Sequence, residues 1–386
     1  MQLSVIILNY NVRYFLELCV LSVQKAIQNI EAEIIVVDNN SSDDSCAMMQ
    51  QRFPNVKLIQ NKENAGFPKG NNIGVAQTKG EYICILNPDT VVAEDTFEKV
   101  LAFAKSKIDL GIVGCKLIDG TGKFLPESKR GIPTPWVAFT KIFGLYKMFP
   151  NSALFNKYYA QHLGENQTGK VEILVGAFMV MKRELYIELG GFDENCFMYS
   201  DDIDLSYMAL QKGKSNYYFP ETTVIHYKGE STVKDGTYMK RFQEAMNFFY
   251  QKHFKVSVFF SLFMKIGIVF FSLVKMFQGK SKAKQTPERY ILISNKEATK
   301  EIVEQKLQKN TIRKAPENGK IVFSQTISKG KNEEIILDLN DVSFRESIRF
   351  LEVNATNAFT FKLLPPESHF IIGSNSSNDR GEVVLI

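Results

Sequence analysis

The sequence lacks several features that would assign it to a common class of protein. Its 386 residues contain only five cysteines and no CxxC pair, which argues against a disulfide framework and against a zinc site. A net charge of +5 is small for a nucleic-acid binder, in which basic residues are more numerous or more clustered. The first apolar run has no basic segment before it and no small-residue cleavage site after it, unlike a signal peptide. We therefore expect the amino-terminal part of the chain to lie in the cytoplasm.

The first third of the chain alternates apolar runs with stretches of helical spacing. Residues 3–8 are continuously apolar, which is typical of a parallel strand buried on both faces. The pattern predicts strands at 3–8, 33–38, 56–60 and 82–86, and helices at 12–26, 43–52 and 68–77. Alternation of strands and helices with short links predicts an α/β fold with a doubly wound, mostly parallel sheet.

The middle of the chain is less regular. The segment 123–135 is rich in proline, glycine and charge, which predicts an exposed loop. Lys129 and Arg130 in that loop are interpreted as solvated charges, with contact to a phosphate as the alternative. We place the end of the catalytic domain near Lys240, which gives a first domain of residues 1–240. Within it the sequence predicts further strands at 111–118, 171–181, 217–219 and 223–226, and helices at 183–189 and 201–211.

Residues 256–277 are strongly hydrophobic, with a narrow polar stripe and lysines on both sides. This pattern predicts an amphipathic helix on an anionic membrane surface, within a membrane-associating segment at 241–285. A spanning helix is the first alternative, but it would place Lys265 near the bilayer centre at a cost of roughly 2.5–3.5 kcal/mol. A helix packed on the catalytic domain is the second. We therefore expect a peripheral, monotopic protein on the inner face of the cell membrane.

Residues 286–386 form a third predicted unit, a small α/β domain without a GxGxxG loop and with no assigned role. The sequence predicts strands there at 289–294, 321–323, 334–339, 359–364, 370–372 and 383–386, and helices at 297–308 and 344–351.

Polar residues follow three of the predicted strands of the first domain. They are Asn9-Tyr10-Asn11, the run at 38–43 that begins with Asp38, and Asn87-Pro88-Asp89-Thr90. Ligands of open α/β sheets bind beyond the carboxyl ends of the strands, so these side chains are candidates for a binding site. The alternative is that they only form turns and helix N-caps; their recurrence in three segments favours the binding site.

At this point the sequence resembles the inverting family 2 glycosyltransferases of the GT-A fold, in particular the rhamnosyltransferase-like branch. The similarity covers roughly residues 3–232 and does not extend into the C-terminal unit. It is carried by several ordered blocks, which are the runs at 4–11, 36–43 and 86–90, Asn64-Ala65-Gly66-Phe67, Gly70-Asn71-Asn72-Ile73-Gly74, Gly176-Ala177-Phe178-Met179, Gly190-Gly191-Phe192-Asp193-Glu194, the run Phe197-Met198-Tyr199-Ser200-Asp201-Asp202-Ile203-Asp204-Leu205, and His226 with Gly229 and Ser231.

The resemblance implies a nucleotide-sugar site. Asp38 would contact the base, and the backbone near Asn9 would lie against the nucleoside. Other residues would shape the pocket for sugar and diphosphate, and Gly66 would permit close backbone approach. The full nucleotide-binding set is Asn9, Tyr10, Asn11, Asp38, Asn40, Asn64, Gly66, Phe67, Asn71, Asn72 and Asn87.

The resemblance also implies a divalent cation, Mg or Mn, held by Asp89 and His226 against the diphosphate. The family often has two or three carboxylates at this position, whereas this chain has Asn87 and Pro88 before a single Asp89. One carboxylate with phosphates and water can still hold the ion. A purely structural histidine is the alternative for His226.

The acid pair Asp201-Asp202 opens a predicted helix, where the macrodipole favours ionised carboxylates. By similarity to the family, Asp202 is the general base that takes the proton of the acceptor hydroxyl, and Asp201 orients it or binds the sugar. The alternative is that both acids, like Asp204, only favour the helix N-terminus. A single base without an enzyme nucleophile implies inversion at the anomeric carbon.

The prediction is therefore a glycosyltransferase that uses dTDP-rhamnose or a UDP-sugar, and that acts on a lipid-linked or growing cell-surface polysaccharide at the membrane surface. A nucleotidyltransferase is disfavoured, because no glycine-rich, basic signature accompanies the first strand. A catalytically weak nucleotide-sugar-binding or scaffold protein is the remaining alternative.

Overall fold

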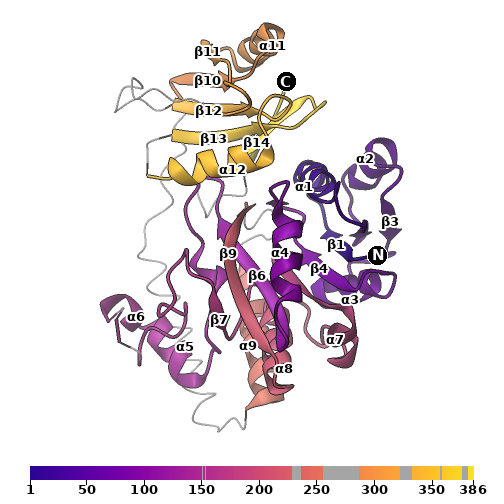
Figure 1. Cartoon of the computed structure of the whole chain (residues 1–386), viewed down its shortest axis with the longest axis vertical. Coiled ribbons are helices and arrows are strands. Elements are labelled where there is room, and N and C mark those ends of the chain that lie inside the picture. Colours follow the sequence, from indigo (N-terminus) through magenta and orange to yellow (C-terminus); the bar gives the residue numbers. More distant parts are fainter. Residues whose placement is uncertain are drawn as a thin grey trace.

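The computed structural model describes residues 1–149, 151–152, 154–227, 236–254, 287–321, 333–356, 359–375 and 381–386. The helix predicted at 256–277, most of the strand predicted at 321–323, and Gly229 and Ser231 lie outside these residues. The described part contains two β-sheets, each accompanied by helices, and Figure 1 shows the second sheet above the first.

The first sheet is mixed, with the order β3-β2-β1-β4-β8-β6-β9-β5, and β7 pairs with β9. The parallel arrangement expected from the sequence holds for β3-β2-β1-β4 and for β6–β9, whereas β8, β7 and β5 run antiparallel to their neighbours. The strands are β1 (Leu3–Asn9), β2 (Ala32–Asp38), β3 (Lys57–Gln60), β4 (Tyr82–Leu86), β5 (Thr90–Val91), β6 (Leu110–Ile118), β7 (Gly169–Val171), β8 (Phe178–Lys182) and β9 (Ser215–His226).

The prediction of one strand at 171–181 was wrong. The chain leaves the sheet after β7 and re-enters it at β8, and residues 172–177 form an irregular segment between them. This segment contacts helix α8, since the Gly176 N–H donates a hydrogen bond to the side chain of Asp202 (3.0 Å).

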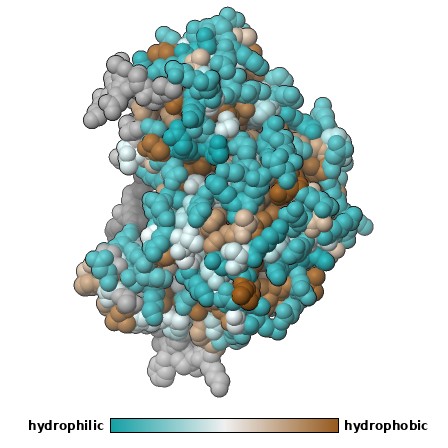
Figure 2. Space-filling model, viewed as in Figure 1, coloured by the Kyte–Doolittle hydropathy of each residue, from teal (hydrophilic) through white to brown (hydrophobic). Residues whose placement is uncertain are grey.

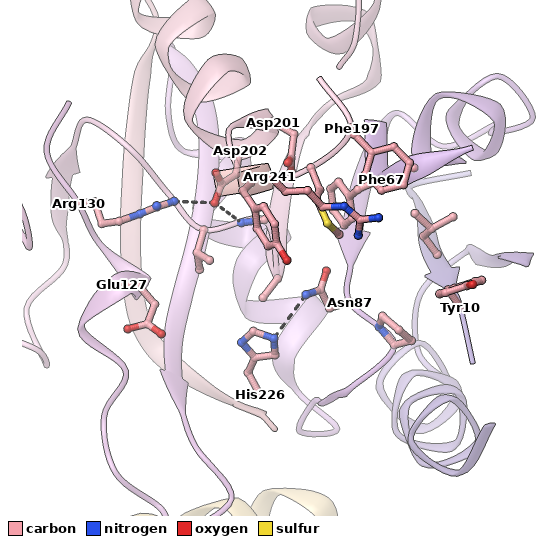
Figure 3. Close-up of a pocket in the computed structure, with 18 of the residues that line it drawn as sticks. Tyr10, Phe67, Asn87, Glu127, Arg130, Phe197, Asp201, Asp202, His226 and Arg241 are labelled. Carbon is pink, nitrogen blue, oxygen red and sulfur yellow. Dashed lines mark hydrogen bonds and ion pairs between the residues drawn. The ribbon is translucent and has the colours of Figure 1, made fainter. Parts of the chain in front are cut away.

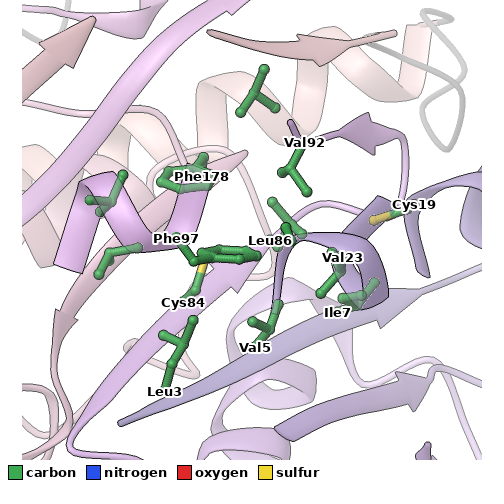
Figure 4. Close-up of a cluster of buried hydrophobic side chains, with 14 of the residues drawn as sticks. Leu3, Val5, Ile7, Cys19, Val23, Cys84, Leu86, Val92, Phe97 and Phe178 are labelled. Atoms are coloured by element: carbon green, nitrogen blue, oxygen red, sulfur yellow. The ribbon is translucent and has the colours of Figure 1, made fainter. Parts of the chain in front are cut away.

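Helices cover both faces of the first sheet. The apolar positions of α1 (Arg13–Ala26) and α4 (Thr96–Lys105) pack on one face, where Phe97 stacks on Phe178 with ring centroids 6.1 Å apart (Figure 4). The remaining helices of this part are α2 (Ser45–Arg52), α3 (Gly66–Val75), the short 3-10 turn Pro126–Ser128, α5 (Pro135–Ile142), α6 (Leu145–Met148), α7 (Arg183–Glu188), α8 (Asp201–Gln211) and α9 (Gly236–His253).

The second sheet has the order β11-β10-β12-β13-β14-β15, and its first four strands are parallel. Its strands are β10 (Arg289–Ile293), β11 (Thr311–Lys314), β12 (Glu333–Asp338), β13 (Phe359–Leu364), β14 (Phe370–Gly373) and β15 (Glu382–Leu385), and its helices are α11 (Glu297–Leu307) and α12 (Phe344–Val353). As domain limits, the boundaries at 240 and 285 stay predictions.

The two sheets share a buried apolar cluster that joins Phe15, Ile225 and Tyr227 to Ile348 and Phe361. Helix α12 lies at this junction (Figure 1), and its first two N–H groups donate to the carboxylate of Glu94 at 2.7 and 2.8 Å. A carboxylate at a helix N-terminus satisfies free donors and complements the helix dipole. Because Tyr227 follows His226 directly, this contact also supports the end of β9 that carries the histidine.

Candidate active site

A cleft of about 420 Å³ opens beyond the carboxyl ends of β1 and β4. Its walls come from segments far apart in the sequence, so it exists only in the folded chain. Figure 3 shows the acid pair on one side, His226 and Asn87 below it, and Tyr10 and Phe67 on the other side. The lining residues that bear on the site are Tyr10, Asn39, Asn64, Gly66, Phe67, Asn87, Glu127, Arg130, Lys141, Tyr158, Tyr159, Phe197, Tyr199, Asp201, Asp202, His226 and Arg241.

Asp202 lies at the first turn of α8 and faces the cleft. Its Oδ2 accepts hydrogen bonds from Arg130 Nη2 (2.5 Å) and from the Gly176 N–H (3.0 Å). Among the described residues, its other oxygen, Oδ1, accepts no hydrogen bond, which leaves it available to a ligand. The cation and the N–H group fix the orientation of this carboxyl group toward the cleft.

Asp201 has a different environment. Burial, and then the charge of the adjacent Asp202, raise the pKa of its carboxyl group to about 7. Two carboxyl groups that share a site cannot both ionise without cost. Asp201 therefore retains its proton up to near-neutral pH, and two acids in different environments are typical of sites that separate proton acceptor from proton donor.

The prediction that Lys129 and Arg130 are solvated was wrong. Lys129 is buried and its ammonium donates to the carbonyl oxygens of Tyr159 (3.2 Å) and Ala160 (3.1 Å). The Arg130 backbone pairs with that of Ile173, which brings its guanidinium to Asp202. Burial lowers the pKa of Arg130, but the charge of Asp202 outweighs it, and the net pKa is raised.

The nucleotide side of the cleft is built on a polar network at the ends of β1 and β2. Asp38 accepts hydrogen bonds from Asn9 Nδ2 (2.7 Å), from Ser41 Oγ (2.6 Å) and from the Ser41 N–H (2.8 Å). Asn11 and Asn40 have positive φ angles of 56° and 62°, a conformation that asparagine tolerates better than most residues. None of these four predicted residues, Asn9, Asn11, Asp38 and Asn40, lines the cleft itself, whereas Asn39 does.

Gly66 lies in the turn that forms the wall of the cleft on its nucleotide side. Its φ is +80°, and a Cβ there would lie 2.9 Å from both the ring and the carbonyl oxygen of Phe197. The adjacent Phe67 N–H donates to that same oxygen (3.0 Å). Glycine is required here because a side chain would push the turn away from Phe197. The turn places Asn64, Gly66 and Phe67 on the cleft, as predicted.

Asn71 and Asn72 do not line the cleft. Asn71 Nδ2 donates to the carbonyl of Phe67 (2.9 Å), within its own helix. Asn72 binds the carbonyl and N–H of Phe192 and accepts from the Tyr186 hydroxyl (2.6 Å). The contacts of Asn72 tie α3 to the loop before α8, and the nucleotide-binding role of both asparagines stays a prediction.

Asp89 and His226 come together, as the sequence predicted, with His226 Nε2 3.4 Å from Asp89 Oδ1. Asn87 Nδ2 lies 3.4 Å from the same nitrogen. Asp89 sits behind the other two and is not part of the cleft lining. Among the described residues, His226 Nδ1 and Asn87 Oδ1 are buried without a hydrogen-bond partner. The group therefore offers carboxylate, imidazole and amide atoms with capacity to bind a further species.

Several lining residues were not singled out from the sequence. Lys141 lies with its ammonium 3.7 Å from the ring centre of Tyr158, and Arg241 lies 4.9 Å from that of Phe197. Tyr199 has a φ of +80°, which is uncommon for a residue with a bulky side chain and is often found at functional sites. With Arg130, the cleft thus contains three cations beside its acid pair, a composition that suits an anionic ligand.

Comparisons with known proteins identify relatives for this site. The sequence model described as Glycosyl transferase family 2 matches residues 4–190. The chain is 26% identical over 213 residues to N-acetylglucosaminyl-diphospho-decaprenol L-rhamnosyltransferase of Mycobacterium tuberculosis, a match that covers 52% of this chain and 68% of that protein. It is 27% identical over 223 residues to rhamnosyltransferase WbbL of Escherichia coli, covering 53% and 78%. Among solved structures, the mannosyltransferase PcManGT from Pyrobaculum calidifontis, in complex with GDP-Man and Mn2+, aligns with a TM-score of 0.47 at 16% identity, covering 72% of this chain and 76% of that one.

Proposed function

We propose, from the match of residues 4–190 to the Glycosyl transferase family 2 model, that the protein transfers a sugar, with inversion, from a nucleotide diphosphate to an acceptor hydroxyl. The acceptor is a lipid-linked or growing cell-surface polysaccharide, and the donor is dTDP-rhamnose or a UDP-sugar. The names of the two rhamnosyltransferase relatives support this choice. A scaffold protein without activity is disfavoured, because the acid pair lines an open cleft.

The observation that carries the proposal is the position of Asp202. Its Oδ2 is held by Arg130 and by the Gly176 N–H, and its Oδ1 is available to take the proton of the acceptor hydroxyl. As that proton leaves, the hydroxyl oxygen forms the new bond to the anomeric carbon, and the bond from that carbon to the diphosphate breaks. Because the acceptor attacks directly, the configuration inverts. Asp201, protonated up to near-neutral pH, can donate a hydrogen bond to a sugar oxygen.

The leaving diphosphate needs positive charge. The donor set of Asp89, His226 and the Asn87 amide fits a divalent cation such as Mn²⁺, since oxygen and imidazole ligands are both acceptable to it. In the part of the chain that the structure describes, no three histidine, cysteine or acidic residues form a complete metal site. Donor phosphates and water would have to supply the remaining ligands. When bound, the cation neutralises charge on the diphosphate, and Arg241 and Lys141 add positive charge on the same cleft.

Association with the cytoplasmic membrane surface is part of the proposal, since a lipid-linked acceptor is found there. In the described residues, no helix is long and apolar enough to cross a membrane. The anchor predicted at 256–277 lies outside those residues and stays a prediction.

A donor screen tests this function. The thermal midpoint of the full chain is measured with dTDP-rhamnose, UDP-sugars and GDP-mannose, each with Mn²⁺ and with EDTA. A ligand that binds only the native state raises stability by RT ln(1 + [L]/Kd), about 2.7 kcal/mol at a hundredfold excess over Kd. We expect the dTDP or UDP donor to stabilise the protein in Mn²⁺ and to support transfer, and EDTA to abolish transfer. Full transfer in chelator would remove the metal role of Asp89 and His226, and stabilisation by no donor would contradict the proposed activity.

A further inference from the structure

Exposed apolar side chains gather on one segment, at α5, α6 and the turn after them. Trp136, Phe143, Met148, Phe149 and Leu154 are 43%, 37%, 68%, 47% and 56% exposed, and we call these five residues the aromatic patch. Elsewhere in the described residues, large exposed apolar side chains are spread along the sequence, as at Ile108, Ile187 and Ile302. Scattered exposure is ordinary, whereas a contiguous apolar patch marks an interaction surface.

The patch is ordered by its own ring contacts. Trp136 contacts Phe139 and Phe155, with ring centroids 5.3 and 5.9 Å apart, and Phe155 contacts Phe149 at 5.2 Å. The Trp136 Nε1–H donates to the carbonyl of Leu154 (2.9 Å). With its one polar atom satisfied internally, the indole ring can enter an apolar phase without losing a hydrogen bond to water.

The other face of α5 secures the patch to the catalytic domain. Val137 and Ala138 are buried, and Ala138 packs in a cluster with Ile173, Ile203 and Phe249. Lys141, on the same helix, lines the active-site cleft. The helix therefore presents apolar rings to the outside and a cation to the cleft, and Figure 1 places α5 and α6 at one end of the molecule, where Figure 2 shows brown and tan atoms at the lower left.

The segment that carries the patch has charge of one sign. Between Glu127 and Glu165 the sequence contains five lysine or arginine residues and no acidic residue; Lys129 is buried, and Arg130 and Lys141 line the cleft. Lys147 and Lys157, near the patch, are exposed. Aromatic and aliphatic side chains beside cations, without carboxylates, suit the interface of a bilayer that contains anionic lipid. A protein partner would require no such exclusion of acidic residues.

We propose that the aromatic patch is a membrane-contact surface that inserts into the headgroup region of an anionic phospholipid bilayer. The active-site cleft would then lie close to the surface of that bilayer. The aromatic patch is distinct from the segment at 256–277. The use of the aromatic patch in catalysis rests on the proposed function, because a lipid-linked acceptor would then enter the cleft from the membrane beside Lys141. The membrane contact itself does not rest on that function, since binding to vesicles needs neither donor nor acceptor.

The chain offers its own reporter, because Trp136 is its single tryptophan. The full chain is mixed with vesicles of phosphatidylcholine alone or with roughly a third phosphatidylglycerol. We expect Trp136 emission to shift to the blue with the anionic vesicles and to be quenched by bromine-labelled acyl chains. Emission that is unchanged when the protein is bound to vesicles overturns the proposal, as does equal binding to both vesicle types.

Two matched triple variants assign the contact. Phe143→Ser, Met148→Ser and Phe149→Ser together remove most of the patch and keep the reporter, while Ile108→Ser, Ile187→Ser and Ile302→Ser together remove a similar set of exposed residues elsewhere. In vesicle co-sedimentation, we expect the patch variant to bind about tenfold more weakly or worse, and the control to bind like wild type. Wild-type binding by the patch variant would assign the membrane contact to another part of the chain. A blue shift that grows with protein concentration without lipid, with dimers in sedimentation velocity, would show that a second copy occupies the patch.

Discussion

In the described residues, each of the two sheets has acidic residues at the carboxyl ends of parallel strands, and the candidate active site lies beside the first sheet. At the edge of the C-terminal sheet, Asp338 accepts from Ser294 Oγ (2.8 Å) and from the N–H and side chain of Asn340. Asp341 accepts from the Asn295 N–H (2.8 Å) and from Ser294. The polar groups at this edge satisfy one another within and between two neighbouring loops.

Beside the first sheet, the acid pair at the start of α8 instead faces a cleft. Asp202 takes its cation from Arg130, 72 positions away in the sequence, and keeps one oxygen for a ligand. The difference indicates that acidic residues near a sheet form a candidate site where distant segments build an opposing wall. Here α8, the 172–177 segment and the loop around Arg130 supply that wall.

The variant pair with the largest expected effect replaces one acid beside each sheet. Asp202→Asn removes the proposed base and should lower kcat by about a hundredfold or more, which is the usual scale for general-base catalysis. The protein should remain folded, because asparagine can still accept from the Gly176 N–H. Asp341→Asn, at the other edge, should leave kcat within about twofold of wild type. Steady-state transfer assays check both, and near-wild-type turnover of Asp202→Asn would withdraw its assignment as the base.

A second test concerns the wall. Arg130→Met leaves Asp202 buried without its cation, and we expect kcat to fall by roughly tenfold or more. Arg130→Lys keeps a positive charge and should recover part of the loss. Circular dichroism and the thermal midpoint of each variant separate unfolding from loss of function. If a folded Arg130→Met variant turned over like wild type, the ion pair would have no part in positioning the base.

The smallest expected effect is a difference in how protein stability depends on pH when Asp201 or Asp341 is replaced. Burial and then the charge of Asp202 raise the pKa of Asp201 to about 7. Between about pH 4 and 7 the native state therefore holds a proton that the unfolded state releases, and wild-type stability falls as pH rises through this window. Asp201→Asn removes that loss, and should be more stable than wild type by about 1 kcal/mol at pH 8, with the gain absent near pH 4.

Asp341 should behave in the opposite way. Partial burial raises the pKa of Asp341, but hydrogen bonds from Asn295 and Ser294 outweigh it, so the pKa is lowered. The stability from its ionised form is present above the unfolded pKa and is lost as pH falls through the folded one. Asp341→Asn should therefore cost up to about 1 kcal/mol at pH 8, with partial exposure limiting the effect. Urea unfolding of both variants from pH 4 to 8 measures the signs, and equal signs would contradict the contrast between the two edges.

Much of the first sheet could be predicted from the sequence, because its strands are continuous runs of apolar residues that can be recognised locally. The predicted strands at 3–8 and 82–86 match β1 and β4 to within one residue, and the helix predicted at 201–211 is α8. The error at 171–181 has a physical cause. Residues 172–177 are apolar enough to resemble a strand, but they belong to no strand of the sheet, and Ile173 instead forms an isolated bridge with Arg130. No local pattern encodes that choice.

The site divides in the same way. The sequence by itself determined which residues could do the chemistry, since the acid pair, Asp89 and His226 are chemical types at ordered positions, and the structure brings the last two to within 3.4 Å. Only the tertiary structure decided that Arg130 pairs with Asp202, that Lys141 and Arg241 line the cleft, and that Asn71 and Asn72 do not. A lysine or arginine in a polar loop has the same local pattern whether it is solvated or paired. Its partner is set by long-range packing, which places a residue beside a neighbour that is distant in the sequence.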